Sequence, residues 1–406
     1  MFKLGTVPHA TIARWKEKYG PVIWLKLGSN NTLVILSASA SEELFKNHDV
    51  SFGDRMLVET MKSHDYHKSS MALAPYGPHW RMLRRLCSME MFAHTKINET
   101  MPVRRKCIDD MMSWIEKEVD RSGMIQIDHF LFAASFNIFG NLILSRDLVE
   151  PDSKTATEFF KSMSRFTYWC SSPNLADLIG WLKPFDPQGL RRNADRDMAK
   201  LLDIVSGFIK ERMEEKQEDK ESKGADEPEK LSEHNISVFI LEMFMAGGET
   251  TSNSTEWAMS ELLRHPDKLM NAKAEIHKMC NKRHYLHGLL LPKNTQVLVN
   301  AWAIGRDPER WDEPLSFKPE RFLGSNVDYR GQHFELIPFG AGRRMCVGLP
   351  LGHRMLHLVL GSLLHEFDWK LEEHADRNTI DMAERMGIAV RKLKPLRVCM
   401  SPRNKN

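Results

Sequence analysis

The chain has 406 residues, of which 42% are hydrophobic and 27% charged, a balance typical of a globular protein with a large core. The formal net charge of +3 is too small to indicate nucleic-acid binding. Six cysteines, at positions 87, 107, 170, 280, 346 and 399, form no CxxC pair, which argues against a disulfide framework and for reduced thiols.

The N-terminal part of the sequence shows no membrane-spanning or secretory segment. No apolar run approaches the roughly 20 residues that a spanning helix needs, and the first twenty residues lack the apolar stretch of a signal peptide. As written, the sequence predicts a chain without a membrane anchor. Residues 22–28 and 32–36 follow, with the composition of two strands around a turn.

From about residue 40 to residue 280 the periodicity is mostly helical, and it is clearest in residues 80–91, 97–119 and 198–213. The almost wholly charged stretch 211–230 predicts a solvated helix end and loop. Without an internal repeat or a convincing linker, one domain over residues 1–406 is favoured. Its fold class is mainly α, with a small β portion near the N-terminus and after residue 285.

A long helix is predicted from about Asn235 to Arg264, ended by His265-Pro266. Two glycines interrupt it in the segment Ala246-Gly-Gly-Glu-Thr-Thr251, and each costs about 1 kcal/mol inside a helix. One interpretation is a local opening of the helical hydrogen bonds beside Glu249 and Thr250, with room for dioxygen and a proton path. The alternative is a close packing contact, with Glu249 solvated.

The segment Pro338-Phe-Gly-Ala-Gly-Arg-Arg-Met-Cys-Val-Gly348 is the most informative part of the sequence. Its glycines allow the backbone to approach a flat cofactor, and a helical run over residues 351–367 follows Cys346. A cysteine near a helix N-terminus favours the thiolate form. A small buried core cysteine is the plainer alternative, which the surrounding pattern disfavours.

The spacing FxxGxRxCxG, carried by Phe339, Gly342, Arg344, Cys346 and Gly348, resembles the haem loop of the cytochrome P450 family. The resemblance implies the cytochrome P450 fold, with haem b between the long central helix and the cysteine loop. It implies that Cys346 is the axial ligand of the iron, that Phe339 packs over the sulfur and that Arg344 binds a haem propionate. Val347 stands where the family usually has proline.

The same resemblance assigns further roles. Thr250 and Glu249 match the family's acid–threonine motif, which steadies iron-bound oxygen and helps to deliver protons. Trp80 and Arg84, one helical turn apart, match a pair that binds a propionate. The substrate-pocket residues implied by position, all of which suit core packing nearly as well, are Phe244, Met245, Ala246 and Ile388.

Arg321, in Pro319-Glu-Arg-Phe322, has a structural role in the family, where a Glu-x-x-Arg helix holds the matching arginine. That helix is missing near residues 280–287. The segment Glu261-Leu-Leu-Arg264 has the same pattern, but it is not the missing helix because it ends the long helix. We therefore expect Arg321 to lack its usual partner, and a buried charge without a partner costs about 3–5 kcal/mol.

The detailed likeness is to plant microsomal members, in the branch that contains geraniol 8-hydroxylase and related terpenoid oxidases. It implies a monooxygenase that inserts one oxygen atom from O2 into a small apolar metabolite, such as a monoterpenol. Electrons would come from NADPH through NADPH–cytochrome P450 reductase, at the cytosolic face of the endoplasmic reticulum membrane. The missing anchor leaves peripheral membrane contact or a cytosolic location open, and nucleic acid is not an expected partner. The alternative is a catalytically impaired, shortened family member, from a splice variant, a pseudogene or a gene-model artefact.

Overall fold

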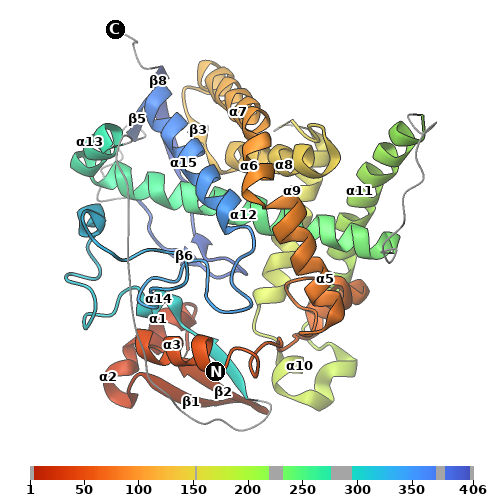
Figure 1. The fold of residues 1–406 in the computed structure, drawn as a ribbon, viewed down its shortest axis with the longest axis vertical. Helices are drawn as coiled ribbons and strands as arrows, with labels where there is room; N and C mark the ends of the chain where they lie inside the picture. Colours follow the sequence, from red (N-terminus) through yellow and green to blue (C-terminus); the bar gives the residue numbers. More distant parts are fainter. Residues whose placement is uncertain (1–3, 151–152, 219–231, 276–294, 372–379, 403–406) are drawn as a thin grey trace. The chain divides into compact units, whose positions relative to one another are not determined.

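The computed structural model describes residues 4–150, 153–218, 232–275, 295–371 and 380–402 (Figure 1). The chain divides into two compact units, each assembled from segments far apart in the sequence. The first unit comprises residues 1–56, 173–188 and 275–349, and the second comprises residues 57–172, 189–274 and 350–406. Each unit is described by itself below, and the organisation as one domain stays a prediction.

The first unit contains a three-stranded sheet in the order β1-β2-β4. Its strands are β1 (Val22–Leu27), β2 (Asn30–Ile35) and β4 (Gln296–Val299). β1 and β2 form the antiparallel hairpin expected around residues 28–31, and β4 joins β2 in parallel. Gly28 has a φ of +62°, which suits glycine at this turn. The predicted N-terminal strands are therefore confirmed.

Short helices surround this sheet in the first unit. They are α1 (Pro8–Arg14), α2 (Lys16–Tyr19), α3 (Ala38–Asn47), α10 (Leu175–Leu178), η3 (Gly180–Phe185), α14 (Ala301–Ile304) and η4 (Pro319–Phe322). Buried Ile23, Val34 and Leu36 pack against Ile12 of α1 and Ala303 of α14, so the helices cover an apolar sheet face. The turn after β1 is tied to α10, because the Ser29 amide donates to the Leu178 carbonyl at 2.9 Å.

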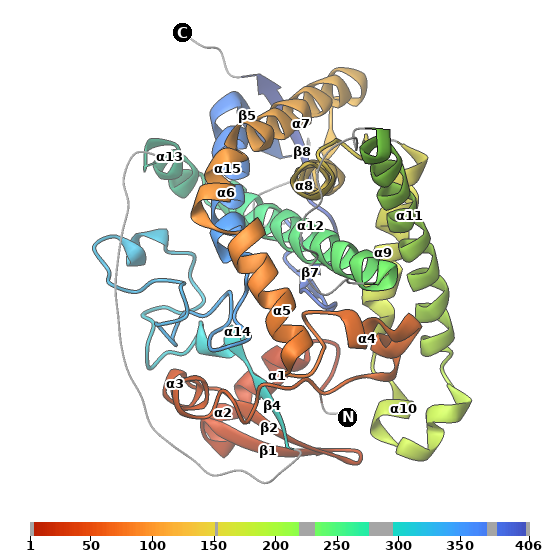
Figure 2. The ribbon, with the colours of Figure 1, turned by 45° about the vertical axis from the view of Figure 1, so that its right-hand side comes forward.

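The second unit is a helical body. Its helices are η1 (Glu59–Asp65), α4 (Tyr66–Ser69), α5 (Pro78–Leu86), η2 (Cys87–Met91), α6 (His94–Glu99), α7 (Met101–Ser122), α8 (Asp128–Leu144), α9 (Lys154–Ser171), α11 (Leu190–Glu218), α12 (Glu233–Arg264), α13 (Pro266–Glu275) and α15 (Leu349–Glu366). α12 runs through this body and packs against α8 and α11 (Figure 2). Residues 219–230 of the predicted charged loop lie outside the described residues.

Small sheets complete the second unit. β3 (Ile125–Gln126), β8 (Arg397–Pro402) and β5 (Phe367–Leu371) form one sheet in that order, and β6 (Glu384–Arg385) pairs antiparallel with β7 (Arg391–Lys392). The strands are short and the described chain is mostly helical, as the sequence predicts. None of the helices that the structure describes is long and apolar enough to cross a membrane.

The long helix is confirmed, but the expected opening at its glycines is wrong. α12 begins after Ser232, whose hydroxyl accepts a hydrogen bond from the Asn235 amide, and it stays α-helical to Arg264. A Cβ placed on Gly247 would lie 1.9 Å from a ring carbon of Phe139 in α8. Close packing of α8 on α12, the second interpretation, accounts for this glycine.

Candidate active site

The cysteine loop, residues 338–348, lies in the first unit and is shaped by backbone turns. Gly340 and Gly342 have φ values of +73° and +66°, a conformation that favours glycine. The Cys346 amide donates to the Phe339 carbonyl at 2.9 Å, and the Met345 amide donates to the Gly342 carbonyl at 3.1 Å. The loop therefore closes on itself, with Cys346 beside the backbone of Phe339.

Two arginines attach this loop to the segment after α3. The Arg344 Nε donates to the Gly53 carbonyl at 2.7 Å, and the Arg343 Nε lies 3.0 Å from the Asp49 carboxylate. A Cβ on Gly342 would lie 2.8 Å from the Phe45 ring, so the close approach requires glycine as much as its φ does. The predicted binding of a propionate by Arg344 stays a prediction.

Cys346 differs from the other described cysteines in its exposure. Its side chain is exposed, whereas those of Cys87, Cys107 and Cys170 are buried and that of Cys399 is intermediate. Burial raises the pKa of Cys87 and Cys107 to about 12, which keeps both thiols protonated. Of the described cysteines, Cys346 is the one presented as a ligand.

On α12 in the second unit, Thr250 and Glu249 are adjacent but face different surroundings. Ala246, Thr250 and Ser254 are exposed at intervals of four residues, so they form a stripe of small side chains along the helix. The Thr250 hydroxyl donates to the Ala246 carbonyl at 2.5 Å. The stripe therefore carries two hydroxyls, those of Thr250 and Ser254, and no large side chain.

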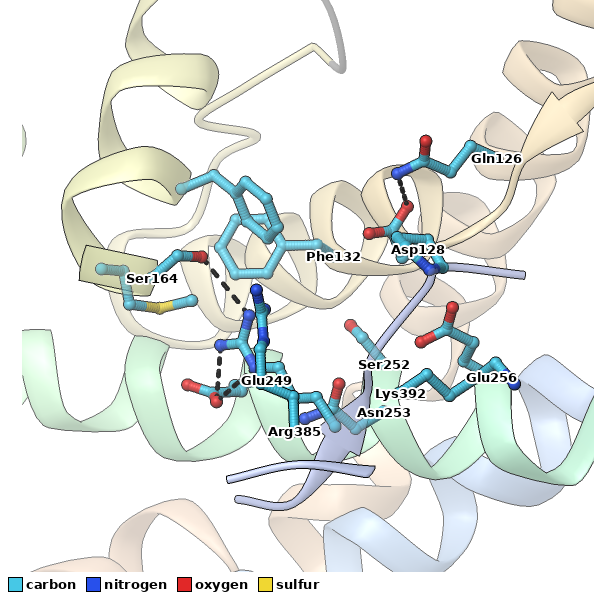
Figure 3. Close-up of a pocket in the computed structure, with 14 residues that line it drawn as sticks. Gln126, Asp128, Phe132, Ser164, Glu249, Ser252, Asn253, Glu256, Arg385 and Lys392 are labelled. Atoms are coloured by element: carbon cyan, nitrogen blue, oxygen red, sulfur yellow. Dashed lines mark hydrogen bonds and ion pairs between the residues drawn. The ribbon is translucent and has the colours of Figure 1, made fainter. Parts of the chain in front are cut away.

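Glu249 is buried, with 6% of its side chain exposed, so its alternative solvated state is wrong. Its Oε1 lies 2.8 Å from the Nε and 2.5 Å from an Nη of Arg391 in β7. That guanidinium also donates to the Ser164 hydroxyl of α9 at 3.4 Å. Figure 3 shows Ser164 and Glu249 around the same pocket.

Sequence reasoning missed Arg391, although one signal was present. The predicted pocket residue Ile388 lies in the apolar run Met386–Val390, and Arg391 directly follows that run. A charged residue directly after an apolar run is a candidate for a buried ion pair. Nothing in the sequence identifies Glu249, 142 residues earlier, as its partner.

A polar cavity of about 300 Å³ adjoins this ion pair. Its lining residues are Gln126, Asp128, Phe132, Phe160, Met163, Ser164, Glu249, Ser252, Asn253, Glu256, Arg385, Arg391, Lys392 and Pro395 (Figure 3). The Asn253 Nδ2 is buried and has no hydrogen-bond partner among the described residues. A roomy polar cavity with an unpaired amide suits ordered water.

Trp80 and Arg84 lie on α5, where Trp80 is 5% exposed and Arg84 is half-buried. The Trp80 indole N–H donates to the Met71 carbonyl at 2.9 Å. The Met71 amide in turn donates to buried Glu242 of α12 at 2.8 Å. Sequence reasoning missed Glu242, whose pKa is raised by burial. The role of Trp80 and Arg84 at a propionate stays a prediction.

The structure separates the predicted pocket residues. Phe244 is fully buried, and its ring stacks on Phe136 at 4.4 Å between centroids, a core position rather than a pocket wall. Met245 is 8% exposed, Ala246 lies on the exposed stripe of α12, and Ile388 is 55% exposed. The role of these four residues in a substrate pocket stays a prediction.

Arg321 is not the buried, unpartnered charge that the sequence suggests. Its guanidinium donates to the carbonyls of Asp312, Glu313 and Ser316, at 2.7, 3.0 and 3.2 Å. It also lies 5.8 Å from the centre of the Trp311 ring. Because the side chain is half-exposed and well bonded, the expected penalty for a buried, unpartnered charge does not arise. The predicted gap at residues 280–287 lies outside the described residues.

Comparisons with known proteins connect these features. The sequence profile of the cytochrome P450 family matches residues 1–285 and 272–400. Cytochrome P450 76A2 of Solanum melongena is 49% identical over 453 residues, which cover 98% of this chain and 90% of the relative. Iridoid oxidase of Catharanthus roseus is 41% identical over 457 residues, with 98% and 89% covered. Geraniol 8-hydroxylase of Swertia mussotii is 34% identical over 451 residues, with 98% and 90% covered.

A solved structure of a zebrafish cytochrome P450 with progesterone superposes with a TM-score of 0.74 at 22% identity, covering 97% of this chain and 99% of that one. At this identity the likeness shows the fold alone, and it confirms the predicted fold class. The aligned spans of the plant relatives exceed the 406 residues of this chain, so it is internally shorter than they are. The chain is therefore a shortened member of the cytochrome P450 family of haem-dependent monooxygenases.

Proposed function

We propose that the chain, as a single domain, inserts one oxygen atom from O2 into a small apolar plant metabolite, a terpenoid such as a monoterpenol. Electrons come from NADPH through NADPH–cytochrome P450 reductase. The observation that carries the proposal is the exposure of Cys346 on a closed glycine loop, whereas Cys87, Cys107 and Cys170 are buried. An exposed thiol and a stripe of small side chains on α12 suit a flat apolar cofactor.

Haem held through a cysteine thiolate supplies the oxygen-activating chemistry when bound. In this chain Cys346 would hold the iron, and Arg344, Trp80 and Arg84 would bind the propionates. Thr250 presents its hydroxyl on the exposed stripe of α12. Glu249, whose carboxylate Arg391 keeps in a fixed orientation, would be the acid of the acid–threonine pair.

The absorption spectrum of the purified, reduced, carbon-monoxide-bound protein tests the site. We expect the red-shifted Soret band typical of thiolate ligation. A band at the blue-shifted position, or no bound haem, would show that the site does not assemble.

The substrate class rests on relatives and on apolar side chains. The names iridoid oxidase and geraniol 8-hydroxylase describe oxidation of terpenoids by related proteins. Met245, Ala246 and Ile388 are apolar, as such a substrate requires. Incubation with reductase, NADPH and geraniol should give a product heavier by one oxygen atom. A haem-loaded protein that oxidises no monoterpenol would contradict this substrate class.

For location we propose the cytosolic face of the endoplasmic reticulum membrane. Exposed apolar side chains on the α10–η3 segment support peripheral contact, since Ile179, Trp181 and Phe185 are 37%, 71% and 70% exposed. Trp181→Ser combined with Phe185→Ser should weaken co-sedimentation with phosphatidylcholine vesicles. Unchanged sedimentation would contradict contact through this segment.

The second candidate is a catalytically impaired family member, favoured by a family match in two segments that overlap at residues 272–285. The relatives place additional residues within the aligned span. Inserting the corresponding segment of cytochrome P450 76A2 should raise haem content and product formation if the shortening impairs the site. Equal haem content and turnover before and after insertion would favour an active chain as it stands.

A further inference from the structure

Two arginines face each other across the β6–β7 pair. Arg385 of β6 is the direct partner of Arg391 of β7 in the antiparallel register. Like charges directly opposite each other destabilise a strand pair. A cross-strand arginine pair therefore needs compensating negative charge.

Among the described residues, only one of these two arginines has a negatively charged partner. Glu249 accepts hydrogen bonds from Arg391 and neutralises it. Arg385 has no hydrogen-bond or ion-pair partner among the residues that the structure describes, and its side chain is exposed. The uncompensated charge indicates a place for an anion.

The two arginines border two cavities, each of about 300 Å³. The polar cavity of Figure 3 also contains the carboxylates of Asp128, Glu249 and Glu256, which repel an anion. The second cavity has no carboxylate in its wall, which is formed by Ser164, Arg165, Thr167, Tyr168, Trp169, Arg385, Met386, Gly387 and Arg391. An anion therefore belongs in the second cavity.

The other residues that line the second cavity indicate that the rest of the ligand is apolar. Tyr168 and Trp169, with ring centroids 4.9 Å apart, and Met386 provide apolar surface. Arg165 is compensated by buried Asp197, whose Oδ1 accepts hydrogen bonds from the Arg165 Nη2 at 2.8 Å and from its Nε at 3.0 Å. Among the described residues of this wall, Arg385 is thus the cation left for the ligand. The volume is at the lower end for small-molecule sites.

We infer that this second cavity binds a small apolar carboxylate, with the carboxylate on Arg385 and the hydrocarbon body against Trp169 and Met386. The inference goes beyond the proposed function, because binding requires neither turnover nor a particular site of oxidation. A charged hydrogen bond contributes more than a neutral one, so the carboxylate should bind more tightly than the alcohol of the same skeleton.

Isothermal titration of the purified holoprotein with geranic acid and with geraniol compares these two groups on one skeleton. We expect geranic acid to bind about tenfold more tightly, with a preference that shrinks as salt rises. Arg385→Gln should remove the preference and Arg385→Lys should retain most of it. Arg121→Gln, at an exposed arginine of α7 paired with Glu118, is the matched control and should change nothing.

Thermal unfolding without ligand supplies a second measurement. A merely structural arginine would lower the midpoint when replaced, whereas Arg385→Gln should leave it equal or higher, because the cross-strand repulsion is relieved. Equal affinity for acid and alcohol, or an acid preference that survives Arg385→Gln, would overturn the inference. These measurements do not depend on product formation, so an inactive enzyme would leave the result interpretable.

Discussion

The cysteine loop and the Glu249 ion pair place a chemically important side chain in opposite ways. Cys346 is held by hydrogen bonds to residues within its own loop, and its thiol is exposed. Glu249 is buried, and its guanidinium partner lies 142 residues away in the sequence. A sequence motif can identify a loop that is formed by local turns. It cannot identify an ion pair between two residues that are distant in the chain.

Replacing the exposed thiol should have the largest effect. Cys346→Ala should abolish the red-shifted Soret band of the reduced carbon-monoxide complex, because it removes the proposed ligand. Cys87→Ala, at a buried thiol whose pKa is about 12, should keep the band. Retention of the band in both variants would refute the ligand assignment.

Breaking the ion pair should cost stability at α12. Arg391→Met leaves the Glu249 carboxylate buried without its partner, at a cost of about 3–5 kcal/mol in the free energy of unfolding. Urea unfolding measures this loss. Adding Glu249→Gln should recover most of it, and Arg385→Gln, at the cross-strand neighbour, should cost nothing. A loss that persists in the double variant would mean that packing, not charge, dominates there.

The close contact of α8 and α12 should give a smaller effect, of steric origin, which a comparison of two helical glycines can measure. A Cβ on Gly247 would meet the Phe139 ring, so Gly247→Ala should lower the free energy of unfolding by about 1–3 kcal/mol. Gly207 of α11 has open space around the same position, so Gly207→Ala should gain about 0.5–1 kcal/mol from helix propensity. Equal responses of the two glycines in chemical denaturation would contradict the contact.

The buried thiols give the smallest effect, at alkaline pH. Unfolded thiols deprotonate near pH 8.5, whereas the folded pKa of Cys87 and Cys107 is about 12. Because the folded state retains these protons, stability should fall as pH rises from about 8.5 to 12. Cys107→Ala should flatten the fall measured by urea unfolding. An identical slope in the variant would show that other groups dominate.

Several elements of the fold were predictable because their signals are local. The hairpin of β1 and β2 follows from apolar strands around Gly28, and the end of α12 follows from His265-Pro266. The cysteine loop was recognisable because glycines, an arginine and a cysteine occupy fixed offsets. For the same reason the predicted helices contain Trp80 and Arg84, on α5, and Glu249 and Thr250, on α12.

The failures of prediction share another cause. The two glycines of α12 suggested an opened helix, but Phe139 of α8 fills the space beside Gly247. Arg321 appeared to lack a partner because the sequence shows charged partners more readily than carbonyl acceptors. Arg391 and Glu242 were missed because their partners are distant in the chain.

The sequence by itself determined the family, the helical character and the position of the glycine-bearing loop that contains Cys346. These depend on periodicity, on turn residues and on short-range spacing, all of which act between neighbours along the chain. Only the tertiary structure decided that Glu249 is buried on Arg391, that Phe244 is core and that Arg385 faces a cavity without a counter-charge. The burial of a side chain and its ion-pair partner depend on contacts between segments that are distant in the chain. A short-range sequence pattern does not specify those contacts.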